Sequence, residues 1–171
     1  MAIMQIENQI LTIISTRFSK AFERITHAVN QLDDQQIWHR PSSNSNSVGI
    51  ILQHLSGNLN QWVCSGIGGH AFERNRSQEF TDLNSVSKKE LLQQIGLLDK
   101  KVQDTVLQVT PESLLAQRRI QGFDETVMSA LITALTHLEI HTGQISFLAK
   151  LMLDKDYKVH WKPLNKEQGK E

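Results

Sequence analysis

The sequence predicts an all-α protein, folded as an antiparallel four-helix bundle with a long connection between the second and third helices. Four stretches carry apolar residues in alternating steps of three and four, the spacing of one face of an α-helix. The chain has 171 residues and one cysteine, so it can bury a single core without disulfides or a structural metal. Sites in such bundles are commonly built between facing helices.

The first two helices are separated by a polar segment. The stripe expected for the first helix comprises Leu11, Ile14, Phe18, Ala21, Ile25, Ala28 and Leu32. Residues 33–46 contain Pro41 and many serines and asparagines, so we expect a loop there. The stripe of the second helix comprises Val48, Leu52, Leu55, Leu59 and Trp62. Ser45, Asn46 or Ser47 is expected to cap this helix, and it is expected to end at the glycines Gly66, Gly68 and Gly69.

The third helix has clear signals at both ends. Ser87 and Glu90 have the spacing of a capping box, so the helix is expected to begin there. Its stripe comprises Leu91, Ile95, Leu98, Val102 and Val109. The ring of Pro111 disfavours a helical Thr110, so the helix is expected to end before this pair.

The fourth helix has the most regular pattern. Residues 114–122 are expected to form a connection, with a short extended piece around residues 118–121. The stripe that follows comprises Val127, Leu131, Ala134, Leu138, His141, Ile145, Leu148 and Met152. We expect residues 1–161 to form one domain and residues 162–171 to be a flexible tail.

Charge and hydropathy exclude several classes of protein. Lys and Arg together number 18, as do Asp and Glu, so no net field directs the chain to nucleic acid. Charged or amide side chains interrupt every hydrophobic run before the roughly 20 apolar residues that cross a bilayer. We therefore expect a cytoplasmic protein with no membrane or nucleic-acid partner.

Three histidines are the candidate metal ligands. His137 and His141 are four residues apart, so they project from one face of the fourth helix about one turn apart. His54 lies beside the stripe of the second helix, and a facing helix can bring it to the same point. Three imidazoles suit zinc, nickel, copper or iron and leave positions on the ion for water or substrate. By spacing alone, however, such histidines are more often hydrogen-bonded core or surface residues.

The same residues carry a family resemblance. The runs Gln53-His54-Leu55-Ser56-Gly57-Asn58 and His137-Leu138-Glu139-Ile140-His141-Thr142-Gly143-Gln144-Ile145 resemble the DinB-like superfamily of metal-binding four-helix bundles. Trp38, Pro41 and the segment Phe72-Glu73-Arg74-Asn75-Arg76 with Glu79-Phe80 resemble its uncharacterised single-domain branch.

The resemblance implies a metal triad of His54, His137 and His141. It also implies a divalent ion, zinc or nickel first and iron or manganese as further options, and frequent homodimers. Some relatives are transferases or isomerases that use low-molecular-weight thiols, whereas many others have no known activity. The resemblance therefore supports an inference about the fold and the metal ligands better than an inference about any reaction.

Several other polar residues are candidates for the site. The amides of Asn58, Gln61 and Gln144 lie on the histidine faces, where they can orient imidazoles, contact substrate or fill structure. Four arginines can bind a carboxylate or phosphate, although solvated surface positions are favoured for them: Arg74, Arg76, Arg118 and Arg119. No inward-facing Asp or Glu is expected beside the triad.

Structural roles are expected for three other features. Leu138 stands where a metalloprotease motif places its general base, and Glu139 is rotated away, so a surface or interface carboxylate is expected there. Cys64 is expected to be a buried structural cysteine. The remaining histidines are expected on the surface or in loops: His27, His39, His70 and His160.

The sequence thus predicts a metal-dependent transferase, which uses a thiol in one version, or a hydrolase, acting on a small molecule. A non-catalytic metal-binding protein and a protein-interaction module without metal are the alternatives.

Overall fold

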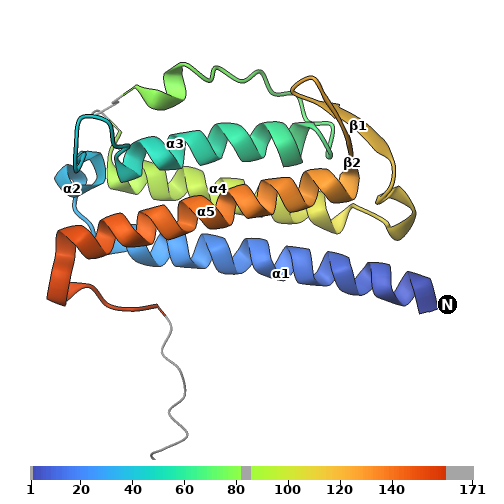
Figure 1. Cartoon of the computed structure of the whole chain (residues 1–171), viewed down its shortest axis with the longest axis horizontal. Coiled ribbons are helices and arrows are strands. Elements are labelled where there is room, and N and C mark those ends of the chain that lie inside the picture. Colours follow the sequence, from blue (N-terminus) through green and yellow to red (C-terminus); the bar gives the residue numbers. More distant parts are fainter. Residues whose placement is uncertain (1, 82–85, 161–171) are drawn as a thin grey trace, which may run out of the picture.

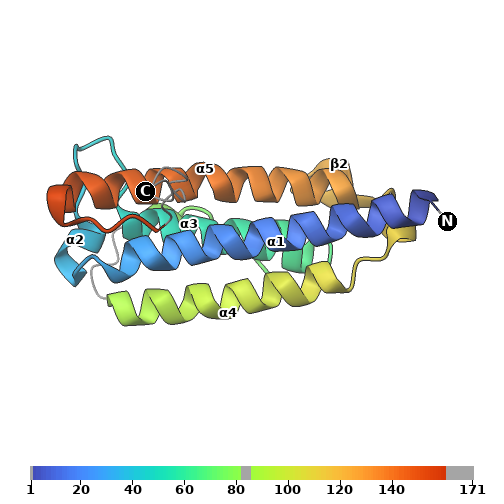
Figure 2. The same cartoon turned by 90° about the horizontal axis from the view of Figure 1, so that it is seen from below.

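Four long helices make up most of the structure. The computed structural model describes residues 2–81 and 86–160, so the expected flexible tail at 162–171 lies outside the described residues. The long helices are α1 (Ala2–Asn30), α3 (Val48–Leu59), α4 (Lys88–Leu107) and α5 (Val127–Leu153). They lie side by side, with α1 against α4 and α5, and α3 against the same two helices (Figures 1 and 2). The expectation of a mainly helical chain is confirmed.

The helices do not all alternate in direction. Figure 1 shows α1 and α5 running one way and α3 and α4 running the other way. The chain leaves α3 at one end and returns along the outside through residues 66–81, and α4 begins at the end where α3 began. This arrangement differs from the antiparallel expectation, because a connection of this length allows two consecutive helices to run parallel.

The core consists of the predicted stripes. Every expected stripe residue of α1 and of the second helix is buried, from Leu11 to Trp62. In α4 and α5 the stripes are buried except at His141, which is partly buried in the middle of α5, and near helix ends, where Val109 and Met152 are partly buried. Burial of apolar surface stabilises a fold by roughly 20 to 30 cal/mol per Å². Burial of these stripes against one another is therefore what aligns the four helices.

Side-chain caps stabilise the N-terminal ends of α2, α3 and α4. The expected loop at 33–46 contains a short helix, α2 (Asp34–Trp38), because Asp33 and Gln36 form a capping box. Ser47 caps α3 by accepting a hydrogen bond from the backbone N–H of Ile50. The predicted capping box before α4 is also present between Ser87 and Glu90. Capping of this kind typically contributes about 1 kcal/mol per helix end.

Three further elements complete the chain. A π-helix, η1 (Asn60–Ser65), continues α3 and ends before the predicted glycines. Short 3₁₀ turns occur at η2 (Gln78–Phe80), η3 (Pro111–Ser113) and η4 (Asp154–Asp156). No helix of the described residues is long and apolar enough to span a bilayer.

A β-hairpin precedes α5. Its strands are β1 (Gln117–Ile120) and β2 (Phe123–Thr126), with Gln117 opposite Thr126. Gln121 and Gly122 have φ values of 52° and 87°. Positive φ at both central residues is typical of the two-residue hairpin turn whose twist matches that of the strands. The extended piece expected at 118–121 corresponds to β1, whereas the second strand was not predicted.

Candidate metal centre

The three predicted histidines converge between α3 and α5. His54 projects from α3, and His137 and His141 project from successive turns of α5. The Nε2 atom of His137 lies 3.1 Å from Nε2 of His54 and 3.2 Å from Nε2 of His141. One ligand atom from each residue lies within 4.8 Å of the others. The structure therefore brings together all three histidines that were predicted from the sequence as candidate ligands.

Two of the imidazoles have acceptors on their far side. The carboxylate of Glu79 accepts a hydrogen bond from Nδ1 of His54 at 2.9 Å. The amide oxygen of Gln144 accepts one from Nδ1 of His141 at 2.7 Å. An acceptor at Nδ1 keeps the ring proton there and leaves the Nε2 lone pair free. Both lone pairs point to the place where the third imidazole also presents its Nε2.

Glu79 is itself held by a buried arginine. Arg74 donates from Nε and Nη2 to the two carboxylate oxygens, at 2.5 and 2.8 Å. The side chains of Arg74 and Glu79 are only 5% and 8% exposed. A paired, bidentate geometry is the condition under which a buried carboxylate remains charged at acceptable cost. The ion pair thus fixes an anion behind His54.

Glycine 57 makes this approach possible. A Cβ atom at Gly57 would lie 1.9 Å from Oε1 of Glu79 and 2.6 Å from its Cδ. These distances are far below van der Waals contact, so any larger residue would displace the carboxylate. Gly57 lies one turn after His54 on α3, and its missing side chain is the space that Glu79 occupies.

Burial favours the neutral form of two of the three imidazoles. Burial first, and the neighbouring imidazoles with Arg74 and Arg76 to a smaller extent, together lower the pKa of His137 from 6.5 to about 4. Burial also lowers the pKa of His141, against the opposing effect of its bond to Gln144. For Glu79 burial acts to raise the pKa, but hydrogen bonds from Arg74 and His54 outweigh it and leave the pKa below its ordinary value. Neutral imidazole is the form that binds a metal ion.

The donor set fits one divalent ion. Two nitrogens bound at about 2.0–2.1 Å to a tetrahedral zinc lie roughly 3.3–3.4 Å apart, close to the spacings of 3.1 and 3.2 Å between the Nε2 atoms. Without an ion, a single proton on Nε2 of His137 would have to be shared between the Nε2 lone pairs of His54 and His141. The buried Nδ1 of His137 has no hydrogen-bond partner among the described residues, so neither tautomer is fully satisfied.

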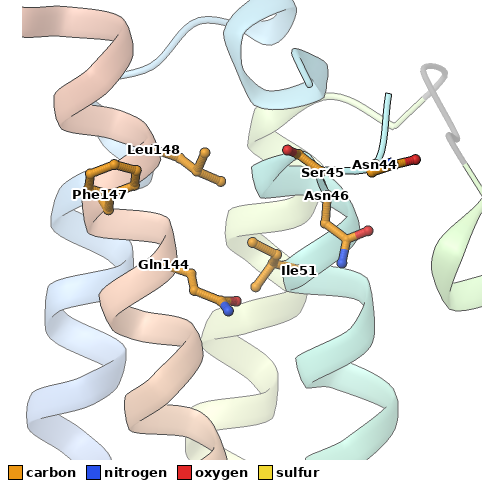
Figure 3. Close-up of a pocket in the computed structure, with 7 residues that line it drawn as sticks. All are labelled: Asn44, Ser45, Asn46, Ile51, Gln144, Phe147 and Leu148. Atoms are coloured by element: carbon orange, nitrogen blue, oxygen red, sulfur yellow. The ribbon is translucent and has the colours of Figure 1, made fainter. Parts of the chain in front are cut away.

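One cavity reaches two of the histidines, and a second lies on the other side of Gln144. One, of about 200 Å³, is lined by His54, Asn58, Trp62, Arg74, Arg76, Gln121, Thr133 and His137. The other, of about 310 Å³, lies between the loop before α3 and the later turns of α5 (Figure 3). In Figure 3 the side chain of Gln144 extends from α5 toward Ile51 of α3. Gln144 therefore contacts both the second cavity and His141.

The other candidate residues divide clearly. Gln61 accepts hydrogen bonds from Arg74 and Gln121 at the edge of the site, so it helps to position the Arg74 side chain behind His54. Arg119 pairs with Asp124 on the exposed face of the hairpin, away from the cavities. Glu139 forms an ion pair with Arg24 of α1, in keeping with its expected role at an interface between helices.

Cysteine and the remaining histidines lie outside the site. Cys64 is fully buried, as predicted, and burial raises the pKa of its thiol. A buried neutral thiol is a poor nucleophile. His27 contacts the carbonyl of Lys158, and His39 and His70 lie in the connections outside the long helices.

Glu79 was missed by the sequence interpretation, which expected no inward-facing carboxylate. It lies on η2, in a connection without helical period, so spacing gave no indication of which way it points. The one available signal was Gly57, a glycine one turn after His54 in α3. A small residue beside a ligand indicates that another group approaches there.

Fold and site together define a class of protein. The fold, a helical bundle with three histidines converging between two of its long helices, is similar to that of solved DinB-like proteins. More narrowly, residues 5–166 match the family described as protein of unknown function DUF1572, and the chain belongs to that family.

Solved structures support the fold. A DinB-like protein from Bacillus cereus ATCC 10987 is 16% identical, with a TM-score of 0.67 over 81% of this chain and 90% of that one. A conserved protein from Enterococcus faecalis is 14% identical, with a TM-score of 0.67 over 83% and 96%. The DinB-like protein YjoA from Bacillus subtilis is 16% identical, with a TM-score of 0.67 over 88% and 99%. No curated protein matches the chain.

Proposed function

We propose that the protein binds one divalent metal ion through His54, His137 and His141, and that it acts as a metal-dependent transferase or hydrolase on a small molecule. Zinc or nickel is the favoured ion, since three neutral imidazoles suit both, and iron or manganese is a further option. The observation that carries the proposal is the convergence of three Nε2 atoms, two of which have their Nδ1 protons committed to acceptors.

Each supporting residue has a definite task. Glu79 holds the proton on Nδ1 of His54, and Gln144 holds the proton on Nδ1 of His141. Arg74 neutralises Glu79 and fixes its orientation. Loss of such outer partners typically costs about 10- to 100-fold in metal affinity or activity.

The contents of the site and the contacts of its carboxylate favour one class of reaction. An ion held here would supply Lewis-acid chemistry to a water molecule or a thiol. Glu79 is committed to Arg74 and His54, so it is not a free general base. The cavity that reaches His54 and His137 gives a small substrate access to the same point. This combination favours attack by water or by a low-molecular-weight thiol over proton abstraction by a carboxylate.

Metal content tests the proposal. Protein purified without a histidine tag is analysed by elemental mass spectrometry as wild type, His54→Ala, His137→Ala and His141→Ala. His70→Ala, an exposed histidine in the connection, is the matched control. About one ion per chain in wild type and control, lost in the three folded variants, supports the site. A wild type that stays metal-free after incubation with zinc, nickel and manganese refutes it.

Assays then separate an enzyme from a metal-binding protein without activity. The metal-loaded chain is tested for thiol transfer to electrophilic substrates and for ester and amide hydrolysis. Turnover that is lost with the metal supports the enzymatic proposal. Tight metal binding without an exchangeable coordination position favours the non-catalytic alternative.

We also propose a homodimer. Four large apolar side chains on α5 are 50% to 65% exposed: Ile132, Ile140, Phe147 and Leu151. They recur at intervals of about one or two turns, so they share one side of the helix. Light scattering after size exclusion is expected to give twice the monomer mass for wild type. The Phe147→Glu variant is expected to have the mass of one monomer. A wild-type monomer refutes the proposal.

A further inference from the structure

A buried hydrogen-bond acceptor borders the cavity of about 200 Å³ beside His54 and His137. Asn58 lines this cavity and is only 8% exposed. Its Oδ1 atom is buried and has no hydrogen-bond partner among the described residues. Buried polar atoms in folded proteins are nearly always paired, so an unpaired one at a cavity indicates a partner that binds there. For an amide oxygen, that partner has to be a hydrogen-bond donor.

The position of Asn58 links this acceptor to the candidate metal ligands. Asn58 follows His54 by four residues in α3, so the two side chains share one face, about 6 Å apart along the helix axis. On α5, Thr133 and His137 have the same spacing and line the same cavity. A molecule with a chain of a few atoms can therefore reach from the histidines to Asn58.

A second buried atom without a partner belongs to His137. Its Nδ1 has no hydrogen-bond partner within the described parts of the chain. When Nε2 of this ring binds a metal ion, the proton lies on Nδ1, which then needs an acceptor. His137 lines the same cavity as Asn58. The cavity is thus bordered by residues with one unpaired acceptor and one unpaired donor, and a group that both donates and accepts suits this combination.

The charge around the cavity disfavours a cationic donor. Arg76 lines the cavity, is exposed, and forms no ion pair with another described residue. Arg74 is paired with Glu79, and none of the residues that line the cavity is acidic. The surroundings are therefore positive, which disfavours an ammonium group. A carboxylate, an ether or a ketone only accepts hydrogen bonds and would leave Oδ1 of Asn58 unpaired. The donors that remain are neutral: a hydroxyl or a carboxamide.

We propose that this cavity is a subsite for a neutral hydrogen-bond donor of a small substrate, a hydroxyl or carboxamide group that donates to Oδ1 of Asn58. The oxygen of the same group can accept a hydrogen bond from Nδ1 of His137. The proposal deepens the function proposed above and rests on it, because it names the substrate class of the same site. The donor end of the substrate lies at Asn58, and the rest of the molecule extends to the three histidines.

Three thiols that differ at one end test the subsite, since zinc binds thiolate sulfur. 2-Mercaptoethanol carries a hydroxyl, 2-mercaptoacetamide a carboxamide, and 1-propanethiol a methyl group that forms no hydrogen bond. Each is titrated by calorimetry into zinc-loaded wild type, Asn58→Leu and Asn8→Leu, which makes the same change on the exposed side of α1. Leucine keeps roughly the size of asparagine and removes the acceptor. The affinity of each polar thiol is divided by that of 1-propanethiol, so differences in thiol acidity cancel between proteins.

A neutral hydrogen bond predicts that this ratio is about 2- to 10-fold higher in wild type and Asn8→Leu than in Asn58→Leu, for at least one polar thiol. The thiol that shows the difference identifies the group that the subsite takes. Metal content, measured by elemental mass spectrometry, is expected to be the same in all three proteins. If both ratios are equal in wild type and Asn58→Leu, the acceptor meets only solvent, and the subsite is overturned while zinc binding stands. Asn58→Ala gives the same reading if leucine at this position prevents folding.

Failure of the metal proposal gives a different result. If wild type holds no zinc, the thiols lose their anchor, and ethanol, acetamide and acetone are titrated into the metal-free protein instead. Acetone has nearly the shape of acetamide but donates no hydrogen bond. A shift of the Asn58 side-chain amide signal in NMR spectra with either donor, but not with acetone, keeps the subsite without a metal centre. Equal or absent responses to all three overturn the subsite as well.

Discussion

Substitution of Gly57 by alanine tests whether the Glu79 carboxylate is fixed behind His54. In an ordinary helix interior, alanine is about 0.8–1.0 kcal/mol more favourable than glycine. Gly96 in α4 provides the control, since a Cβ there meets nothing within 4 Å. Gly96→Ala is therefore expected to raise the free energy of unfolding by roughly 1 kcal/mol.

At Gly57 the same change has the opposite consequence. The new Cβ would lie 1.9 Å from Oε1 of Glu79, so the carboxylate has to withdraw by more than about 1 Å. That displacement breaks the 2.9 Å bond to His54 and at least one bond to Arg74. Hydrogen bonds to charged groups contribute about 1.5–3 kcal/mol each. The net expectation is a loss of about 2–5 kcal/mol after the helix gain.

Two assays read the outcome. Urea denaturation of metal-free protein gives the free energy of unfolding, and competition with a chromophoric chelator gives the zinc affinity. Gly57→Ala is expected to lose stability and about 10- to 100-fold in zinc affinity, whereas Gly96→Ala gains stability and keeps its affinity. If both variants gain stability equally and bind zinc as wild type does, the carboxylate is not fixed by Gly57 and the reasoning is wrong.

Three further predictions concern the site and the fold. Glu79→Gln keeps the shape but removes the charge that orients His54; zinc affinity should fall by about 10-fold or more by chelator competition, and an unchanged affinity would contradict the assigned role. Burial lowers the pKa of His137 to about 4; because the unfolded chain then binds more protons between about pH 6.5 and 4, metal-free protein should lose stability as pH falls through that window. Urea midpoints at several pH values measure this loss, and an equally steep loss in His137→Ala would refute the assignment. Ser87→Ala removes the capping box with Glu90; it should lower the free energy of unfolding by about 1 kcal/mol, visible as a lower melting temperature, and an unchanged value would show that the cap contributes nothing.

The helices and the three candidate histidines could be predicted from the sequence alone. A period of three and four requires only that one face of each segment be apolar, and this property is local. The same holds for the four-residue step that places His137 and His141 on one face, and for the capping signals at Ser47 and Ser87. These features depend on neighbours within a few residues, so they can be read without the fold.

Tertiary structure alone decided what surrounds the ligands. Glu79 and Arg74 lie in a connection with no periodic pattern, and their position over α3 depends on how the chain returns between α3 and α4. The cavity that Asn58 and Arg76 line likewise depends on packing between segments distant in sequence. Local spacing fixes the direction of a side chain relative to its own helix. The contacts of that side chain depend on which segment packs opposite, and burial across the whole chain determines that packing.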